Sequence, residues 1–303
     1  MAIRNFAQLV EEAKKRGPKR LAIAFSHEPA TIIAARRAYD EGIAIPILMG
    51  EVGLIREIAA REGVDLGDFE LIQESNEREA CARVVEMARN GLVDLIMNGL
   101  AQPGHLLRAA LDREKGLRTG KLVTDVSIFE IPGRDKLLLI SDIGVVVSPT
   151  LEQKVEIVQN AIDVAHALGI ECPKVAILAA TEMVNPKIPV SMDAANLAKM
   201  AQRGQIKGGI VDGPLALDNA ISPRSAEVKG IKSEVAGDAD IIIAPDIEAG
   251  NILAKAIIYF ARGKMAGVAV GAKCPLVLPS RADPPETKFV SIAFGVYLSS
   301  PAS

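Results

Sequence analysis

Five segments follow one another in the first part of the chain: RLAIAFS (residues 20–26), TIIAARRAYDEG (31–42), IPILMG (45–50), VGLIREIAAREG (52–63) and FELIQE (69–74). They alternate short apolar runs with longer amphipathic segments. A short apolar run bounded by turn residues is typical of a buried strand, and an amphipathic segment of this length is typical of a helix. The order strand, helix, strand, helix, strand favours a mostly parallel sheet covered by helices on both faces. The sequence therefore predicts an α/β protein.

The same pattern extends along the rest of the chain. It predicts further helices and strands at residues 76–91, 93–99, 104–112, 151–169, 174–180, 190–204, 208–213, 238–246, 251–263, 267–271, 274–280 and 287–300. Two β-rich runs, 122–132 and 135–144, flank the turn at residues 132–135 and predict a hairpin. Because 303 residues exceed the size of most single cores, we expect two α/β domains with a boundary near residue 147.

Composition argues against nucleic acid as a partner. Apolar residues make up 49% of the chain, which is enough for a large core. The net charge is -3, from 35 basic and 38 acidic side chains, and there is no long run of Lys or Arg to follow a phosphate backbone. Aromatic residues are only 3%, so stacking platforms for bases are hard to assemble.

The chain also lacks the patterns of export and of membrane insertion. The first helix-like segment carries Glu11 and Glu12 where a signal peptide would be apolar. The most hydrophobic stretch, residues 252–278, is interrupted by four basic residues and is not a membrane span. The cysteines are three and widely spaced, which predicts reduced, buried thiols: Cys81, Cys172 and Cys274. We expect a cytoplasmic protein.

The segment CPLVLPSRADPPETK (274–288) is the clearest candidate for a functional site. A buried strand is followed directly by Ser280 and Arg281, just before the start of a helix. Ligands of open α/β sheets bind outside the carboxyl ends of the strands, and helix N-termini attract anions. Arg281 is suited to hold a phosphate in a bidentate grip. A structural interpretation is compatible with this one: Asp283 as N-cap, Pro284 as first helical residue and Glu286 as its capping-box partner.

Three more segments, 97–108, 211–218 and 243–251, place polar residues after an apolar strand. Each alone is explained by turn formation or by helix capping, as at Asp246. Four such segments in one chain favour a site. No His/Cys/Asp cluster has the spacing of metal ligands, and no G-x-G-x-x-G follows the first strand. An isolated loop residue such as His27 is more often structural.

Three of these segments also carry a resemblance. VDGPLALDNAIS (211–222), ADIIIAPDIEAGNILAKA (239–256) and CPLVLPSRADPPETKFVSIA (274–293), in this order and spacing, resemble the phosphate acetyl/butyryl transferase family over nearly the whole chain. The segment 179–194 is more similar to the butyryltransferase branch. The resemblance implies two α/β/α domains of the isocitrate/isopropylmalate dehydrogenase-like type with the active cleft between them. It assigns residues 1–147 and 273–303 to the first domain and 148–272 to the second.

The resemblance also implies roles for individual residues. Arg281 would hold the phosphate, Ser280 would assist at the reacting carbonyl, and Arg108 would bind the anionic substrate or coenzyme. Further substrate or coenzyme A contacts are expected from Asn98, Asp212, Gly213, Pro214, Asp246, Gly250, Asn251 and Asp283. Two positions depart from the family pattern. Thr287 stands where acetyl-type members often have a carboxylate, and Asn98 stands where butyryl-type members often have Lys.

The implied reaction is acyl-CoA plus phosphate giving acyl phosphate plus CoA, with coenzyme A as a substrate and without a bound cofactor or metal. A base is needed to take the proton of the CoA thiol, and Glu286 or Asp246 is the candidate. The branch implies phosphate butyryltransferase; phosphate acetyltransferase, a hydroxy-acid dehydrogenase of the same superfold and a catalytically silent CoA sensor are the alternatives. The family is commonly oligomeric, which implies a dimer or a larger assembly.

Overall fold

The computed structural model describes residues 2–67 and 69–299 and divides into two compact units. We call Phe6–Lys121 with Ala266–Ser303 the terminal unit, and Met1–Asn5 with Leu122–Met265 the central unit. Each consists of strands and helices in alternation, so the predicted α/β class is confirmed.

The terminal unit has six strands in the order β3-β2-β1-β4-β11-β10. They are β1 (Lys19–Ala24), β2 (Ala44–Gly50), β3 (Glu70–Gln73), β4 (Leu95–Asn98), β10 (Lys264–Val270), which begins at the unit boundary, and β11 (Leu276–Val277). All neighbouring pairs are parallel except β10 with β11. Its helices are α1 (Phe6–Arg16), α2 (Pro29–Asp40), α3 (Val52–Arg61), α4 (Glu77–Arg89), α5 (Pro103–Ala110) and α11 (Pro285–Ser299).

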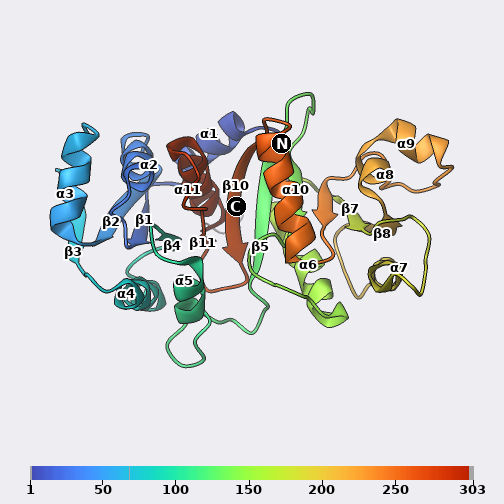
Figure 1. Ribbon diagram of the computed structural model, residues 1–303, viewed down its shortest axis with the longest axis horizontal. Helices are drawn as coiled ribbons and strands as arrows, with labels where there is room; N and C mark the ends of the chain where they lie inside the picture. The colour runs from blue at the N-terminus through green and yellow to red at the C-terminus, as the bar shows by residue number, and fades with distance from the viewer. Residues whose placement is uncertain (1, 68, 300–303) are drawn as a thin grey trace. The chain divides into compact units, whose positions relative to one another are not determined.

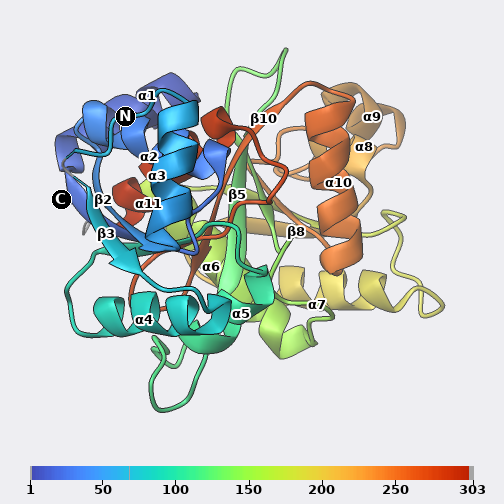
Figure 2. The ribbon, with the colours of Figure 1, turned by 60° about the vertical axis from the view of Figure 1, so that its left-hand side comes forward.

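Helices cover both faces of this sheet. In both ribbon views α1, α2 and α11 lie on one side of the strands, and α4 and α5 lie on the other (Figures 1 and 2). Strands covered on two faces are apolar at successive positions, as in β1, where Leu21, Ala22, Ile23 and Ala24 are all buried. The parallel arrangement brings the carboxyl ends of β1, β4 and β11 to the same edge.

The central unit has the strand order β5-β6-β9-β7-β8. The strands are β5 (Thr124–Glu130), β6 (Leu138–Ser141), β7 (Lys174–Leu178), β8 (Ile210–Leu215) and β9 (Ile241–Ile243). β5 and β6 form the predicted antiparallel hairpin, and the other pairs are parallel. The helices are α6 (Leu151–Ala167), α7 (Pro189–Gln202), α8 (Leu217–Ile221), α9 (Pro223–Val228) and α10 (Ile247–Tyr259).

The core of the central unit follows from the pleat of its strands. Leu138 and Ile140 of β6 pack with Ala254 and Ile257 of α10 in one apolar cluster. Because side chains alternate across a strand, Leu139 points to the opposite face, and α6 contacts the same strands. The unit is thus also a sheet between helices.

Local sequence signals explain where several helices begin and end. α2 has a proline in its first turn and ends just before Gly42, whose φ of 69° is a left-handed conformation that favours glycine. Asn76 caps α4 by accepting hydrogen bonds from two backbone amides. Thr150 and Gln153 form a capping box at the start of α6.

The unit limits differ from the domain limits expected from sequence. Residues 122–147 group with the central unit, because β6 pairs with β9 of that unit, and residues 266–272 group with the terminal unit, because β10 pairs with β11. In the structure, residues 266–303 group with residues 6–121. The predicted last helix reaches Ser299, and residue 300 lies outside the described residues. In the described part of the chain, no helix is long and apolar enough to cross a membrane.

Candidate active site

The carboxyl ends of three strands bring the first predicted residues together in the terminal unit. Asn98 is the last residue of β4, which pairs with β1 on one side and with β11 on the other. Ser280 and Arg281 follow β11 after a short connection. We call the segments after these strands, residues 25–28, 98–105 and 278–283, together with Glu77, which contacts Gln102 and His105, the Ser280 edge.

A tight turn fixes the position of Ser280. The Asp283 carboxylate accepts a hydrogen bond from the Ser280 amide at 2.8 Å, and the Asp283 amide donates to the Ser280 carbonyl at 3.0 Å. Asp283 is buried, whereas Arg281 at the tip of the turn is exposed. The turn thus holds the backbone still and presents the guanidinium to solvent.

The capping box predicted for this segment is wrong. α11 begins at Pro285, one residue later than expected, so Asp283 is not the N-cap, and its carboxylate closes the turn at Ser280 instead. Glu286 does not reach back to the Asp283 amide, because its carboxylate forms an ion pair with Arg37 of α2. Two adjacent prolines both suit a helix start, and the sequence pattern does not choose between them.

Arg281 lies near enough to Glu77, the first residue of α4, to act on it electrostatically. Burial alone would raise the pKa of the Glu77 carboxyl. Hydrogen bonds from the Gln102 amide and from His105, together with the positive charges of His105 and Arg281, bring that pKa below its usual value instead. Glu77 is therefore an ionised group of the Ser280 edge at neutral pH.

Asn98 is fully buried at this edge. Its Nδ2 donates to the Ala101 carbonyl at 2.7 Å and to the Gly99 carbonyl at 3.3 Å, but within the described structure its Oδ1 has no hydrogen-bond partner. A buried acceptor without a donor is unfavourable by about 1–3 kcal/mol. Asn98 thus has an unpaired acceptor that is buried below the surface of this edge.

The other two residues considered near this edge differ in their surroundings. Arg108 is exposed on α5, three residues after His105. His27 is held structurally: its ring lies edge-on to Phe25 at 4.1 Å, and its Nδ1 accepts a long hydrogen bond from the Glu51 amide. Burial lowers the pKa of His27. These contacts agree with the structural interpretation of His27.

The remaining predicted residues belong to the central unit. Asp246 caps α10 by accepting from the Ala249 amide at 2.8 Å, as the structural alternative expected. Gly250 is required by close packing, since a Cβ there would lie 2.4 Å from the Asp142 carbonyl. Asn251 is exposed and donates to the Ile143 carbonyl at 3.2 Å. Together they join the start of α10 to the segment that follows β6.

Two buried carboxyl groups lie beside this segment and were not identified from sequence. Asp142 accepts hydrogen bonds from the amides of Asp125, Gly144 and Val145. Asp125 is buried and accepts from the Ser127 hydroxyl at 2.8 Å. Burial raises the pKa of both carboxyls, and the negative charge of Asp142 raises that of Asp125 further.

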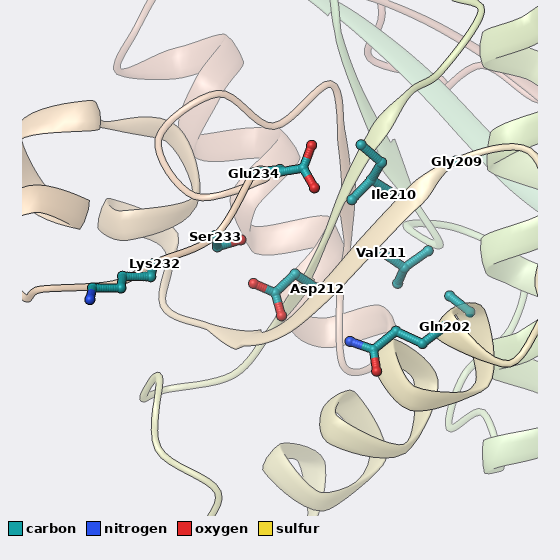
Figure 3. A pocket seen from close by; sticks show the side chains of 9 residues that line it. Gln202, Gly209, Ile210, Val211, Asp212, Lys232, Ser233 and Glu234 are labelled. Atoms are coloured by element: carbon teal, nitrogen blue, oxygen red, sulfur yellow. The ribbon is translucent and has the colours of Figure 1, made fainter.

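Asp212, Gly213 and Pro214 lie within β8, two strands away from β9. Gly213 packs against Ile177 and Ala194 so closely that a Cβ would not fit. Asp212 lines an open pocket of about 600 Å³, shown in Figure 3, together with residues of α7 and of segment 232–234. Asp212 and Glu234 carry carboxylates there and Lys232 extends away from them, so this pocket is a poor site for phosphate.

Two ion-paired clusters at the Ser280 edge were missed because their partners are distant in sequence. Lys288 is fully buried on α11 and pairs with Glu28 at 2.7 Å, with the Thr31 hydroxyl at 3.4 Å. His105 pairs with Glu77 at 2.7 Å. The sequence carries one sign of each cluster: a lysine, Lys288, stands among apolar residues of a helix, and a histidine, His105, stands in the first turn of α5.

The groups of the Ser280 edge are of the kinds that bind anions and transfer protons. It combines an exposed guanidinium, a hydroxyl on a fixed turn, a buried amide acceptor and an imidazole held by a carboxylate. Among the described side chains, no group of three or more His, Cys, Asp or Glu residues is arranged to hold a metal ion.

Comparison with known proteins identifies the relatives of the chain. Residues 78–296 match the family described as phosphate acetyl/butaryl transferase. The chain is 43% identical to the phosphate butyryltransferase of Clostridium acetobutylicum over 98% of its length and 99% of that protein's. It is 48% identical to the phosphate acetyltransferase of Thermotoga maritima, over 94% and 97% of the two lengths.

The fold agrees with these sequence relationships. A branched-chain phosphotransacylase from Enterococcus faecalis V583 superposes with a TM-score of 0.82 at 30% identity, over 93% of this chain and 99% of that one. The matched region includes β4, α5, β11 and all but the last residues of α11, which contribute most of the Ser280 edge. The chain therefore belongs to the phosphate acetyl/butyryl transferase family of acyltransferases.

Proposed function

We propose that this protein transfers a short-chain acyl group between coenzyme A and inorganic phosphate, and that butyryl-CoA is its substrate. The observation that carries the proposal is the Ser280 turn, which holds an exposed Arg281 beside the start of α11. A planar guanidinium at a fixed position suits a phosphate oxygen pair, and the helix N-terminus favours the same negative charge.

In this proposal Arg281 binds the phosphate and Ser280 donates a hydrogen bond to the oxyanion that forms at the acyl carbon. Such a donor typically contributes about 10²- to 10³-fold in turnover. Arg108 and Asn98 are proposed to contact the anionic substrate or coenzyme A, and so are the central-unit residues Asp212, Gly213, Pro214, Asp246, Gly250 and Asn251. Asp283 acts through the turn that it closes. Coenzyme A is a substrate here, and no permanently bound cofactor is required.

The finer assignments are proposals as well. Relatives with the names phosphate butyryltransferase and phosphate acetyltransferase are similarly close in identity, and the segment 179–194 supports the butyryl branch. We propose the isocitrate/isopropylmalate dehydrogenase-like architecture of two α/β/α domains, of which one is discontinuous. We also propose a homo-oligomer in the cytoplasm; three cysteines without a disulfide suit a reducing compartment.

One assay tests the function. Protein is incubated with butyryl-CoA and phosphate, and release of the CoA thiol is followed with a chromogenic disulfide reagent. Release that depends on phosphate supports the transferase, and acetyl-, propionyl- and branched acyl-CoA then define the chain preference. Reduction of NAD(P) with a hydroxy acid would favour the dehydrogenase alternative. Binding of CoA without either reaction would favour the sensor.

The Ser280→Ala variant tests the site. It should lose about 10²- to 10³-fold in turnover while its thermal stability stays close to that of the parent, because the turn is held by backbone and Asp283 contacts that alanine retains. A stability loss with intact turnover would make the hydroxyl structural.

A further inference from the structure

The base of the proposed reaction must be a side chain whose proton-accepting atom is not already held by another group. Glu286 is ion-paired with Arg37, and Asp246 caps α10 through the Ala249 amide. The Ser280 edge contains another candidate in His105, on the first turn of α5.

His105 is oriented by a carboxylate. Its Nδ1 lies 2.7 Å from Oε1 of Glu77, and the same oxygen accepts from the Gln102 amide, so Glu77 ties the start of α4 to the start of α5. The side chains of His105 and Glu77 are 15% and 27% exposed, so the pair is sheltered but still reachable from solvent. A histidine fixed in this way has one defined ring orientation.

The protonation state of Glu77 determines the tautomer of His105. Because the pKa of Glu77 lies below its usual value, the carboxylate is ionised at neutral pH and can only accept. The proton of the neutral imidazole must therefore reside on Nδ1, which leaves the lone pair on Nε2. In the described part of the structure, Nε2 has no hydrogen-bond partner.

The pair lies at the edge that carries the phosphate-binding candidate. α5 follows β4, β4 pairs with β11, and Arg281 follows β11. Arg281 acts electrostatically on Glu77, which places the two groups in the same part of the terminal unit. The ionisable groups that act on Glu77 or are acted on by it include Arg281 after β11 and Cys81 on α4, whose pKa is raised to about 12 by burial and by Glu77.

We propose that His105, held by Glu77, is the general base that removes the proton of the CoA thiol; this inference rests on the proposed function. In the direction that consumes acyl phosphate, Nε2 takes the thiol proton as sulfur attacks the acyl carbon. The new C–S bond forms, the C–O bond to phosphate breaks, and the phosphate leaves with the bonding electron pair. In the reverse direction the imidazolium returns its proton to the departing thiolate. Glu77 stabilises the imidazolium in both directions.

The His105→Asn variant tests the proposal. Asparagine can still donate to Glu77 from its amide but offers no basic nitrogen, so turnover should fall about 10²- to 10⁴-fold with a smaller change in the KM for phosphate. In the thiol-consuming direction the wild type should lose activity as pH falls and the imidazole protonates. That acid limb should be absent from the residual activity of the variant.

Two further variants complete the experiment. Glu77→Gln removes the negative charge that stabilises the imidazolium, so the acid limb should move to lower pH. His166→Asn is the matched control, because His166 lies in the central unit, where its Nε2 contacts the Gly208 carbonyl. The turnover of His166→Asn should remain within about threefold of the wild-type value.

The outcomes separate this proposal from the function on which it rests. A wild-type protein without phosphate-dependent thiol release would overturn both. An active wild type together with a His105→Asn variant of equal turnover and unchanged acid limb would overturn the role of His105 alone. If His105→Asn folds poorly, Glu77→Gln decides: an acid limb at the wild-type pH would overturn the proposal.

Discussion

Replacing Lys288 with Met should destabilise the terminal unit more than any exposed charge change on the same helix. Lys288 is fully buried, and its Nζ lies 2.7 Å from Oε2 of Glu28, whose side chain is only 12% exposed. The Thr31 hydroxyl donates to the same carboxylate oxygen at 2.6 Å. Methionine is unbranched and fills the space of the lysine stem, so the substitution removes the charge and leaves the packing nearly unchanged.

The magnitude follows from what remains in the variant. Without Lys288, Glu28 keeps a negative charge in a sheltered position with one hydroxyl donor, and breaking a buried pair in this way costs about 3–5 kcal/mol. Glu286→Gln is the matched control on α11. It breaks the ion pair between Glu286 and Arg37. The Arg37 side chain is 43% exposed and that of Glu286 is 53% exposed, and an exposed ion pair contributes less than about 1 kcal/mol to stability.

The assay is equilibrium unfolding in urea of the wild type, Lys288→Met, Glu286→Gln and the double variant Lys288→Met/Glu28→Gln. The double variant should recover part of the loss, because it no longer contains an uncompensated charge. Equal free energies of unfolding for Lys288→Met and Glu286→Gln, or a double variant less stable than Lys288→Met, would contradict the reasoning. The same Glu286→Gln protein also reports on catalysis: activity within about threefold of wild type would exclude Glu286 as the base.

Three other predictions follow from the same structure. Arg281→Lys should raise the KM for phosphate or lower turnover by at least about tenfold, measured by steady-state kinetics, because an ammonium does not reproduce a planar fork. The pKa of the Asp125 carboxyl is raised in the folded state, which therefore keeps a proton that the unfolded state loses above about pH 4. The free energy of unfolding should fall as pH rises, and in urea unfolding measured at several pH values the Asp125→Asn variant should show a smaller fall. Native protein should show one fast-reacting thiol with a chromogenic disulfide, the exposed Cys172, and Cys172→Ser should abolish it, since burial raises the pKa of Cys81 and Cys274 to about 12.

Sequence reasoning succeeded where a residue's role depends on its near neighbours. The strands were found because their apolar runs are buried on two faces, and the hairpin because Pro132 and Gly133 mark the turn between β5 and β6. The two short helices α8 and α9 were missed, because five and six residues are too few to show a helical period. The expectation of three buried cysteines is confirmed only for Cys81: Cys172 lies exposed after α6, and Cys274 is half-buried.

The sequence indicates part of the candidate site for the same reason. Ser280 and Arg281 stand at the end of a strand, a position that sequence alone indicates. The pairing of His105 with Glu77 spans 28 positions and that of Lys288 with Glu28 spans 260, so neither has a local pattern. Both depend on strand order, which places α4 next to α5 and α11 next to α2, and strand order is a property of the folded chain.

The split of the terminal unit along the chain has a consequence for biosynthesis. β11 and α11 are translated after the central unit, yet β11 pairs with β4 and α11 contacts α1 and α2. Until the ribosome has made residues 266–303, one side of β4 is an unpaired strand edge and the apolar faces of α1 and α2 lack their cover, which is the kind of surface that aggregates. The central unit is nearly continuous and is complete by Met265. During synthesis the central unit can therefore fold before the terminal unit is complete. Termination near residue 265 should yield an insoluble product, although most of the described residues are then present.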